Sequence, residues 1–279
     1  MFSFFKRYRC HPAKNSSQPR SFTFMTVSEY CPPMTQASFE SADFSLSCAG
    51  DWLNQRQGKA GATHSDHFSG TAVQVTPFQR ALSDSRNQHA IPVVISNCTE
   101  TMLSILPAIA DTDAEVGIIH IGHQLHLDQT LEPKLGSAFH FALCRYPNVR
   151  LFFAGVCIEE STLASLDYAE DQGCDWITEH EYTFRNRHSV KQQISHYLSH
   201  CDQAVISIDL RALFTKSGLE ENHALDIRMV LRTLRNCLMS GKVTAINLVG
   251  DKEYLIYSKH TKSILEEIHL QAEQVTHAA

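Results

Sequence analysis

Four histidines lie close together in the middle of the sequence and could bind a metal ion. His120, His123 and His126 are spaced three residues apart, Asp128 follows them, and His140 lies further on. Imidazole and carboxylate are ligands of zinc and iron, so this group suggests a site for one such metal. Along an extended strand His120 and His126 would share a face and His123 would point to the other, so at most some of them converge. A lone histidine is more often hydrogen-bonded or exposed than a ligand, and both interpretations stay open.

Cys98 and the pair of Asp209 and Arg211 are the other residues whose types suggest chemistry. Cys98 follows an apolar run and would be a nucleophile if His126 reached it. A buried thiol is the simpler interpretation, because neither a base nor oxyanion donors are evident. Asp209 and Arg211 are two residues apart at the end of another apolar run. Side chains at this spacing face the same way in a strand, so we expect them to pair.

Short apolar runs bounded by turn residues recur along the chain and would position these residues. We predict strands at residues 44–48, 92–96, 116–121, 149–156, 204–208 and 243–249. Continuous apolar runs of this length suit strands covered on both faces, as in a parallel sheet. Amphipathic segments predict helices at residues 161–172, 190–200, 223–240 and 261–272. This alternation predicts a single α/β domain with three α/β/α layers and a mostly parallel sheet, whose function lies at the carboxyl ends of the strands.

Composition excludes several classes of protein. The chain has 279 residues and a formal net charge of -6, and its basic residues form no stripe that could follow a phosphate backbone. We therefore expect no nucleic-acid partner. No stretch approaches the roughly 18 apolar residues of a membrane span, so we expect no membrane partner either. Nine widely spread cysteines without a CxxC motif are typical of thiols in a reducing compartment, which favours the cytoplasm.

The N-terminal segment differs from the rest of the chain. Residues 1–28 contain basic and hydroxyl side chains but no acidic residue. We interpret residues 1–28 as a disordered leader and residues 29–279 as the folded domain, with Met25 as a possible start. The alternative is a transit peptide that directs the protein to an organelle.

The predicted strands end in short segments whose order and spacing form a pattern. These segments are residues 50–62, 93–101, 117–128, 136–139, 151–175, 205–211 and 245–250. In this order they resemble the ureohydrolase family of arginase, agmatinase and formimidoylglutamase, and the formimidoylglutamase branch most of all. The resemblance covers residues 44–268 and implies the arginase-like fold. It depends on order and spacing, since no single motif is complete.

The resemblance also implies where a pair of manganese ions would be held. Family enzymes hydrolyse linear amidine C–N bonds with two manganese ions bound by four aspartates and two histidines. Asp209 matches one of these ligands. The other five positions hold different residues, and Gly250 stands where the family has a glutamate; these positions are Thr99, Gly122, Gln124, His126, Arg211 and Gly250. A guanidinium cannot ligate a metal or lose its charge, so we expect no manganese pair, and we expect Arg211 with His126 to fill its place.

These substitutions suggest a function other than that of the family. We expect a catalytically silent ureohydrolase-like protein with a binding or regulatory role. Its expected partners are a small guanidino, amidino or carboxylate ligand, and further copies of itself or an active paralogue. The alternative is an active amidine hydrolase with a remodelled site or one divalent ion, zinc or manganese, for which Asp209 and His126 are the candidate ligands.

Overall fold

A parallel β-sheet forms the centre of the protein in a computed structural model, which describes residues 21–56, 66–71, 76–109, 113–215 and 224–277. Within these residues the strands are β1 (Ser21–Tyr30), β2 (Asp66–Thr71), β3 (Ala90–Ser96), β4 (Val116–Ile121), β5 (Val149–Val156), β6 (Asp175–Thr178), β7 (Gln203–Asp209) and β8 (Val243–Val249). They pair in the order β2-β1-β3-β8-β7-β4-β5-β6. Every pairing between them is parallel, as the continuous apolar runs predict.

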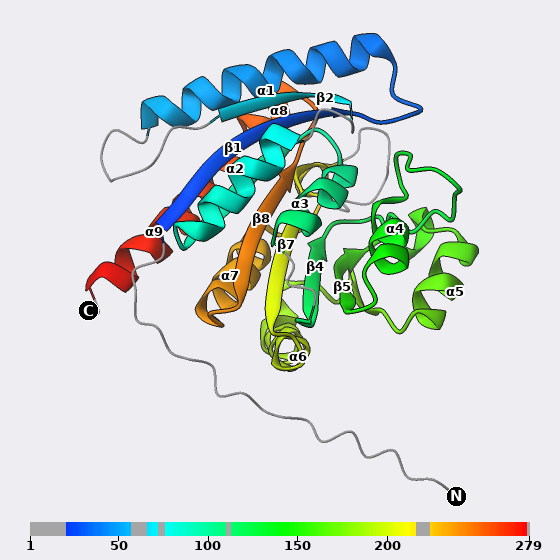
Figure 1. Cartoon of the computed structure of the whole chain (residues 1–279). Helices are drawn as coiled ribbons and strands as arrows, with labels where there is room; N and C mark the ends of the chain where they lie inside the picture. Colours follow the sequence, from blue (N-terminus) through cyan, green and yellow to red (C-terminus); the bar gives the residue numbers. More distant parts are fainter. Residues whose placement is uncertain (1–20, 57–65, 72–75, 110–112, 216–223, 278–279) are drawn as a thin grey trace, which may run out of the picture.

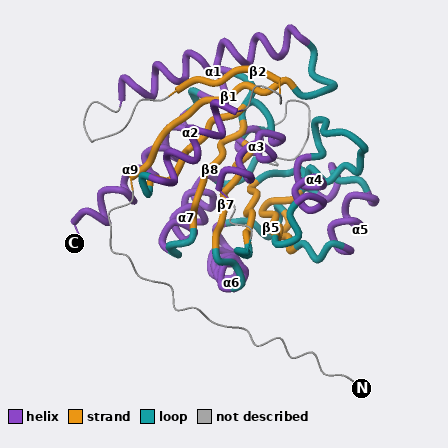
Figure 2. Tube along the Cα trace, in the orientation of Figure 1, coloured by secondary structure: helices purple, strands orange, loops and turns teal. Residues whose placement is uncertain are grey.

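Helices cover both faces of this sheet (Figures 1 and 2). The α-helices are α1 (Gln36–Arg56), α2 (Thr76–Asn87), α3 (Met102–Ile109), α4 (Ala138–Arg145), α5 (Leu163–Asp171), α6 (Arg187–Ser199), α7 (Ile227–Met239), α8 (Glu253–Ile256) and α9 (Lys259–His277). Buried side chains of α2, α3, α4 and α5 form a core on one face, and those of α1, α6, α7, α8 and α9 form a core on the other. The result is the predicted three-layer α/β/α architecture.

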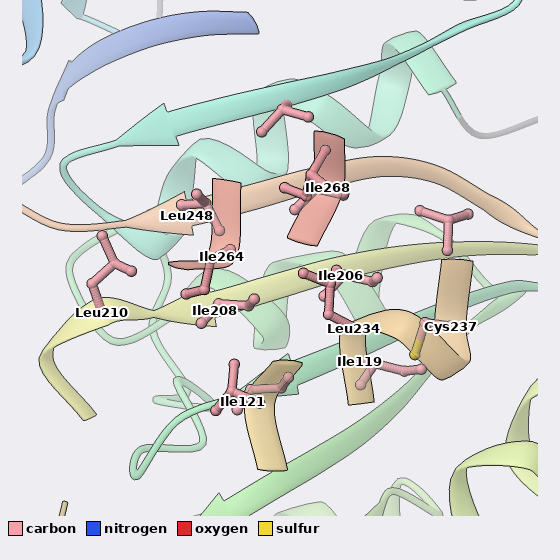
Figure 3. Close-up of a cluster of buried hydrophobic side chains, with 14 of the residues drawn as sticks. Ile119, Ile121, Ile206, Ile208, Leu210, Leu234, Cys237, Leu248, Ile264 and Ile268 are labelled. Atoms are coloured by element: carbon pink, nitrogen blue, oxygen red, sulfur yellow. The ribbon is translucent and has the colours of Figure 1, made fainter. Parts of the chain in front are cut away.

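The core beneath α7 and α9 shows how the central strands are held. Isoleucines of β4 and β7 and Leu248 of β8 pack against Leu234, Cys237, Ile264 and Ile268 (Figure 3). Each of these side chains is fully buried. Burying a side chain of this kind stabilises the fold by roughly 1.5–3 kcal/mol, so the sheet forms a rigid platform for the residues at its strand ends.

The structure confirms most predicted elements and corrects one strand. β4, β5 and β8 begin and end where the sequence predicts, and β3 and β7 are each slightly longer. Residues 44–48, predicted as a strand, lie inside α1 instead. A run of five residues is too short to distinguish a strand from a buried helical segment by its pattern. Gly50 and Asp51 of the expected early loop also belong to α1, and residues 57–62 of that loop lie outside the described residues.

The N-terminal part of the domain also differs from the prediction. Strand β1 begins at Ser21 and is buried over most of its length, so residues 21–28 belong to the sheet and not to a leader. Residues 1–20 lie outside the described part of the chain. None of the helices in the described residues has the length and apolar character that a membrane span needs.

Candidate functional site

Asp209 and Arg211 lie at the carboxyl end of β7, near the middle of the sheet. The backbone N–H of Arg211 donates to Asp209 Oδ1 over 2.9 Å, and the Arg211 Nε donates to the same oxygen over 3.3 Å. The Asp209 side chain is buried, while that of Arg211 is 48% exposed. Asp209 raises the pKa of the Arg211 guanidinium by its negative charge, so the arginine stays cationic. The ion pair expected from the spacing is present.

His126 approaches this pair from the loop that follows β4. Its Nε2 lies 3.4 Å from Thr99 Oγ1, and both residues are buried. The backbone of His126 is left-handed, with φ of 49°. Residues 122–128 form an irregular loop that begins with a bend at Gly122 and His123, and not an extended strand. The pKa of His126 is lowered to about 4, chiefly by burial; the negative charge of Asp209 opposes the shift and the positive charge of Arg211 adds to it. The imidazole is therefore neutral near pH 7.

His120 lies beneath His126, on β4 itself. Its Nδ1 is 3.1 Å from Ser207 Oγ, and its ring meets the His126 ring edge-on at 5.3 Å between centroids. A Cβ placed on Gly122 would lie 2.7 Å from His120 Nε2 and 3.1 Å from the Cβ of Asp209. The His120 imidazole thus occupies the room that a side chain at position 122 would need.

The structure brings together some of the predicted site residues and separates others. Thr99, Gly122, His126, Asp209 and Arg211 form one neighbourhood, here called the strand-end site. Gly250 follows β8, and a Cβ placed there would meet Leu210. Gln124 is exposed.

The remaining histidines do not converge on the strand-end site. His123 contacts Glu179 Oε2 at 3.3 Å and the Gly155 carbonyl at 3.2 Å, away from His126. His140 hydrogen-bonds to Tyr168 over 3.0 Å. Among the described residues no group of three or more His, Cys, Asp or Glu side chains is arranged to hold a metal ion. The mononuclear zinc or iron site suggested by the spacing has no such group to support it.

Cys98 has the surroundings of a structural thiol. It is 3% exposed, and burial raises its pKa well above the usual value. Its Sγ lies 3.8 Å from Thr101 Oγ1. Since the thiolate is the nucleophilic form, this environment opposes the nucleophile interpretation.

A pair of manganese ions does not fit the donor set of the strand-end site. Such a pair needs several anionic oxygens to offset its charge. Asp209 Oδ1 already accepts two N–H groups of Arg211, and His126 faces Thr99. Gly122 offers no side-chain donor, and His120 blocks the room for one. The Arg211 guanidinium would add repulsion to any cation placed beside Asp209.

Two buried carboxylates near this site were not singled out in the sequence. Glu29 is the next-to-last residue of β1, and Glu100 follows Thr99 in the 3₁₀ helix η2 (Thr99–Thr101); both are buried. Asn97 joins the end of β3 to Glu29: its Oδ1 accepts from Glu29 N over 2.8 Å, and its Nδ2 donates to Glu29 O over 2.9 Å. Glu100 could have been found from the sequence, because it directly follows the predicted site residue Thr99. Glu29 was placed at the domain boundary, where burial was not expected.

Comparisons with known proteins identify the fold and nothing finer. No protein-family model and no curated protein matches the sequence. Among solved structures, the formimidoylglutamase from Bacillus subtilis subsp. subtilis str. 168 is similar, with a TM-score of 0.69 and 14% identity over 93% of this chain and 88% of that one. The arginase from Bacillus cereus gives 0.69 and 13% over 91% and 97%. The agmatine ureohydrolase of Thermoplasma volcanium gives 0.62 and 13% over 93% and 90%. The chain therefore has the arginase-like α/β fold that these ureohydrolases share.

Proposed function

We propose that the protein is a catalytically silent ureohydrolase-like protein with a binding or regulatory role. The observation that carries this proposal is the ion pair of Arg211 with the buried Asp209. In the ureohydrolases that the sequence resembles, the residues at both positions are ligands of the manganese pair. Here one is a fixed cation and the other is its counterion, so the charge that would attract metal ions is already offset.

The neighbouring residues support the same proposal. A neutral His126 next to Thr99 adds no negative charge, and Gly122 adds no ligand. An active hydrolase of this class would need an activated hydroxide, which two metal ions supply in the family. None of the side chains in the strand-end site replaces that contribution.

The strand-end site favours a carboxylate as its ligand. Arg211 is half exposed, and a guanidinium recognises carboxylates by paired hydrogen bonds. A guanidino or amidino ligand would need Asp209 instead, and the Oδ1 of that residue is already engaged by Arg211. We include in the proposal an assembly with further copies of the chain or with an active paralogue, for which the mass of the purified protein in solution is the direct measurement.

Metal content and turnover of the full-length protein test the proposal together. The purified chain is equilibrated with excess manganese, desalted, and analysed for bound metal and for hydrolysis of arginine, agmatine and N-formimidoylglutamate. We expect well below one equivalent of manganese and no turnover above the buffer rate. About two equivalents of manganese together with turnover of any of these substrates would overturn the proposal.

The competing function, a hydrolase with a single metal ion, makes a different prediction for the same protein. His126 and Asp209 are its candidate ligands. It requires that the wild-type protein retain about one equivalent of zinc or manganese. This metal should be lost in His126→Asn. It should be kept in His140→Asn, because the His140 imidazole contacts Tyr168 outside the site. Retention of that equivalent in both variants would place the metal elsewhere and count against this alternative.

A further inference from the structure

A separate cavity opens beyond the carboxyl end of β1. Its volume is about 480 Å³, and it lies between β1, η2, α2, α3 and the end of α4. Glu29 and Glu100 are its buried acidic residues, whereas Glu132 and Arg145 are exposed. We call this cavity the acidic pocket. The residues of the strand-end site are not among those that line it.

Glu29 is held in place and has one oxygen without a partner. The residue is 7% exposed, and its backbone is fixed by both amide atoms of Asn97. Hydrogen bonds from Thr101 and Ser104 act on the carboxyl group, yet Oε2 has no hydrogen-bond partner among the described residues. A buried oxygen of this kind costs roughly 1–3 kcal/mol if nothing binds it, so it indicates a missing partner.

Glu100 places a second carboxylate in the same pocket. Its Oε1 accepts from the backbone N–H of Gly136 over 2.8 Å and of Ser137 over 3.2 Å. Burial raises the pKa of Glu100, and burial together with the negative charge of Glu100 raises the pKa of Glu29 to about 7. Two carboxyl groups that disfavour each other's charge would both gain from one cation between them.

The cations of the described residues form no ion pair with these two carboxylates, although the charges of Arg211 and Glu100 act on each other. Neither Glu29 nor Glu100 takes part in an ion pair there. Arg145 is exposed at the pocket and lies over the Phe141 ring, with 5.3 Å from its Cζ to the ring centroid. The described residues also contain no three-ligand group suited to a metal ion, so the chemistry favours an organic cation.

The rest of the lining indicates what the cation is attached to. Cys31, Leu103, Pro107 and Pro133 give the pocket apolar walls beside its acidic residues. Burial raises the pKa of the Cys31 thiol to about 12, so this residue adds no charge near pH 7. A hydrocarbon stem would pack against these walls while its charged end reached the carboxylates.

We propose that the acidic pocket binds a small organic cation, a primary ammonium group on a short apolar stem, with the ammonium ion between Glu29 and Glu100. Three N–H donors of an ammonium ion match carboxylate oxygens on two sides. This inference is independent of the proposed function, because none of the strand-end residues takes part in it.

Binding of n-butylammonium to the full-length protein, measured by calorimetry or ligand-observed NMR at pH 8, tests the proposal. n-Butanol serves as the uncharged analogue, and magnesium and potassium ions serve as inorganic competitors. We expect n-butylammonium to bind at least tenfold more tightly than n-butanol. Equal binding of the two, no binding at 100 mM, or stronger binding of an inorganic ion would each overturn the proposal.

Two isosteric variants locate the charge that binds. Glu29→Gln is expected to weaken n-butylammonium binding at least tenfold, while Glu132→Gln at the exposed rim changes it less than twofold. Circular dichroism confirms that both variants are folded. Unchanged binding in Glu29→Gln would rule out the assigned position of the ammonium ion.

The pH dependence of binding gives a second readout. Glu29 faces Glu100 from η2, Cys31 from its own segment, Glu132 from the loop after β4, and Arg145 and Tyr146 from the end of α4. With a pKa of about 7, its carboxyl group loses its proton between pH 6 and pH 8, so the affinity for n-butylammonium should rise about tenfold over this range. The rise should disappear in Glu29→Gln and persist in Glu132→Gln. A wild-type affinity that is flat over this range would contradict the assignment.

Discussion

Asp209 and Glu29 are both buried carboxylates at the carboxyl ends of parallel strands, yet their surroundings are opposite. Asp209 accepts two N–H groups from Arg211, a residue of its own strand end. Glu29 has an oxygen, Oε2, that no described residue hydrogen-bonds, and a second carboxylate, Glu100, close by. At one strand end Arg211 pairs with the carboxylate, and at the other none of the described residues forms an ion pair with Glu29.

The same contrast extends to the residues whose pKa values move. In the strand-end site, burial lowers the pKa of His126 to about 4 and disfavours a positive charge. In the acidic pocket, burial raises the pKa of Glu29 to about 7 and disfavours a negative charge. Folding therefore makes a group at each place resist ionisation, but in opposite pH ranges, and this difference can be measured as stability.

Replacing Glu29 should produce the largest change in stability. Its pKa is raised from 4.5 to about 7, so the folded state binds this proton more tightly than the unfolded chain does. The free energy of unfolding then falls as pH rises from 4.5 through 7, by about 3 kcal/mol. Glu29→Gln lacks this loss and should be about 3 kcal/mol more stable than wild type at pH 8 and nearly equal to it at pH 4.5. Urea unfolding at both pH values measures the difference; an equal gain at both would show that titration is not its cause.

Replacing His126 should show the opposite pH dependence. Its pKa falls from 6.5 to about 4 on folding, so the unfolded chain takes up this proton first as the solution is acidified. The free energy of unfolding then decreases by about 3 kcal/mol between pH 6.5 and pH 4. His126→Asn should lose less stability on acidification, because asparagine does not titrate. Asparagine is chosen because it tolerates the left-handed backbone at this position.

In His126→Asn the decrease in the free energy of unfolding on acidification should be smaller but not absent, because the buried His120 also has a lowered pKa. His140→Asn is the matched control and should leave this decrease as it is in wild type. A decrease as large in His126→Asn as in wild type would mean that His126 is already charged in the folded protein.

The fold was more predictable than the two sites, for physical reasons. Strands β4, β5 and β8 are buried on both faces and were readable as continuous apolar runs. Strand β1 was missed because its sequence, with many hydroxyl groups and no long apolar run, continues the composition of the preceding residues. The strand predicted at residues 44–48 is a partly buried stretch of α1, and a short apolar pattern does not distinguish the two.

The contacts in the two sites also differ in how far they could be predicted from the sequence: contacts between residues close in sequence were predictable, and contacts that depend on the fold were not. The pairing of Asp209 with Arg211 is predicted from a spacing of two residues in a strand. The structure has the pair, but Arg211 lies in the 3₁₀ helix η5 (Leu210–Leu213), which Asp209 caps. The backbone of Glu29 is held by Asn97, which is 68 residues away in sequence and comes close because β1 pairs with β3. The room taken by His120 at Gly122 depends on side-chain packing, which residue spacing does not encode.

Adding a side chain at Gly122 should cost less than the titration effects but should still be readily measured. A Cβ there meets His120 Nε2 at 2.7 Å, and His120 is fully buried and held by Ser207, so it cannot move aside cheaply. Gly122→Ala should lower the free energy of unfolding by about 2 kcal/mol. Denaturation at pH 7 measures this loss.

Gly250→Ala is the matched control for this prediction. Its Cβ would meet the terminal Cδ1 of Leu210 at 3.0 Å and the Leu255 Cβ at 3.4 Å, both wider than the 2.7 Å contact at Gly122, and it should cost less than about 1 kcal/mol. If Gly122→Ala costs no more than Gly250→Ala, then His120 does not block the position, and a ligand side chain could be restored there.

Removing the charge of Arg211 should have the smallest effect on stability and the sharpest bearing on metal binding. Arg211→Met keeps the backbone N–H that donates to Asp209, and the lost guanidinium is half exposed, so the cost should be about 1 kcal/mol at pH 7. Manganese binding to this variant, measured by calorimetry beside wild type, separates two causes of exclusion. If charge alone keeps metal out, Arg211→Met should gain affinity; if the missing ligands do, it should bind manganese no better than wild type. We expect the second result, because Gly122 still offers no side-chain ligand and His120 still blocks the room for one.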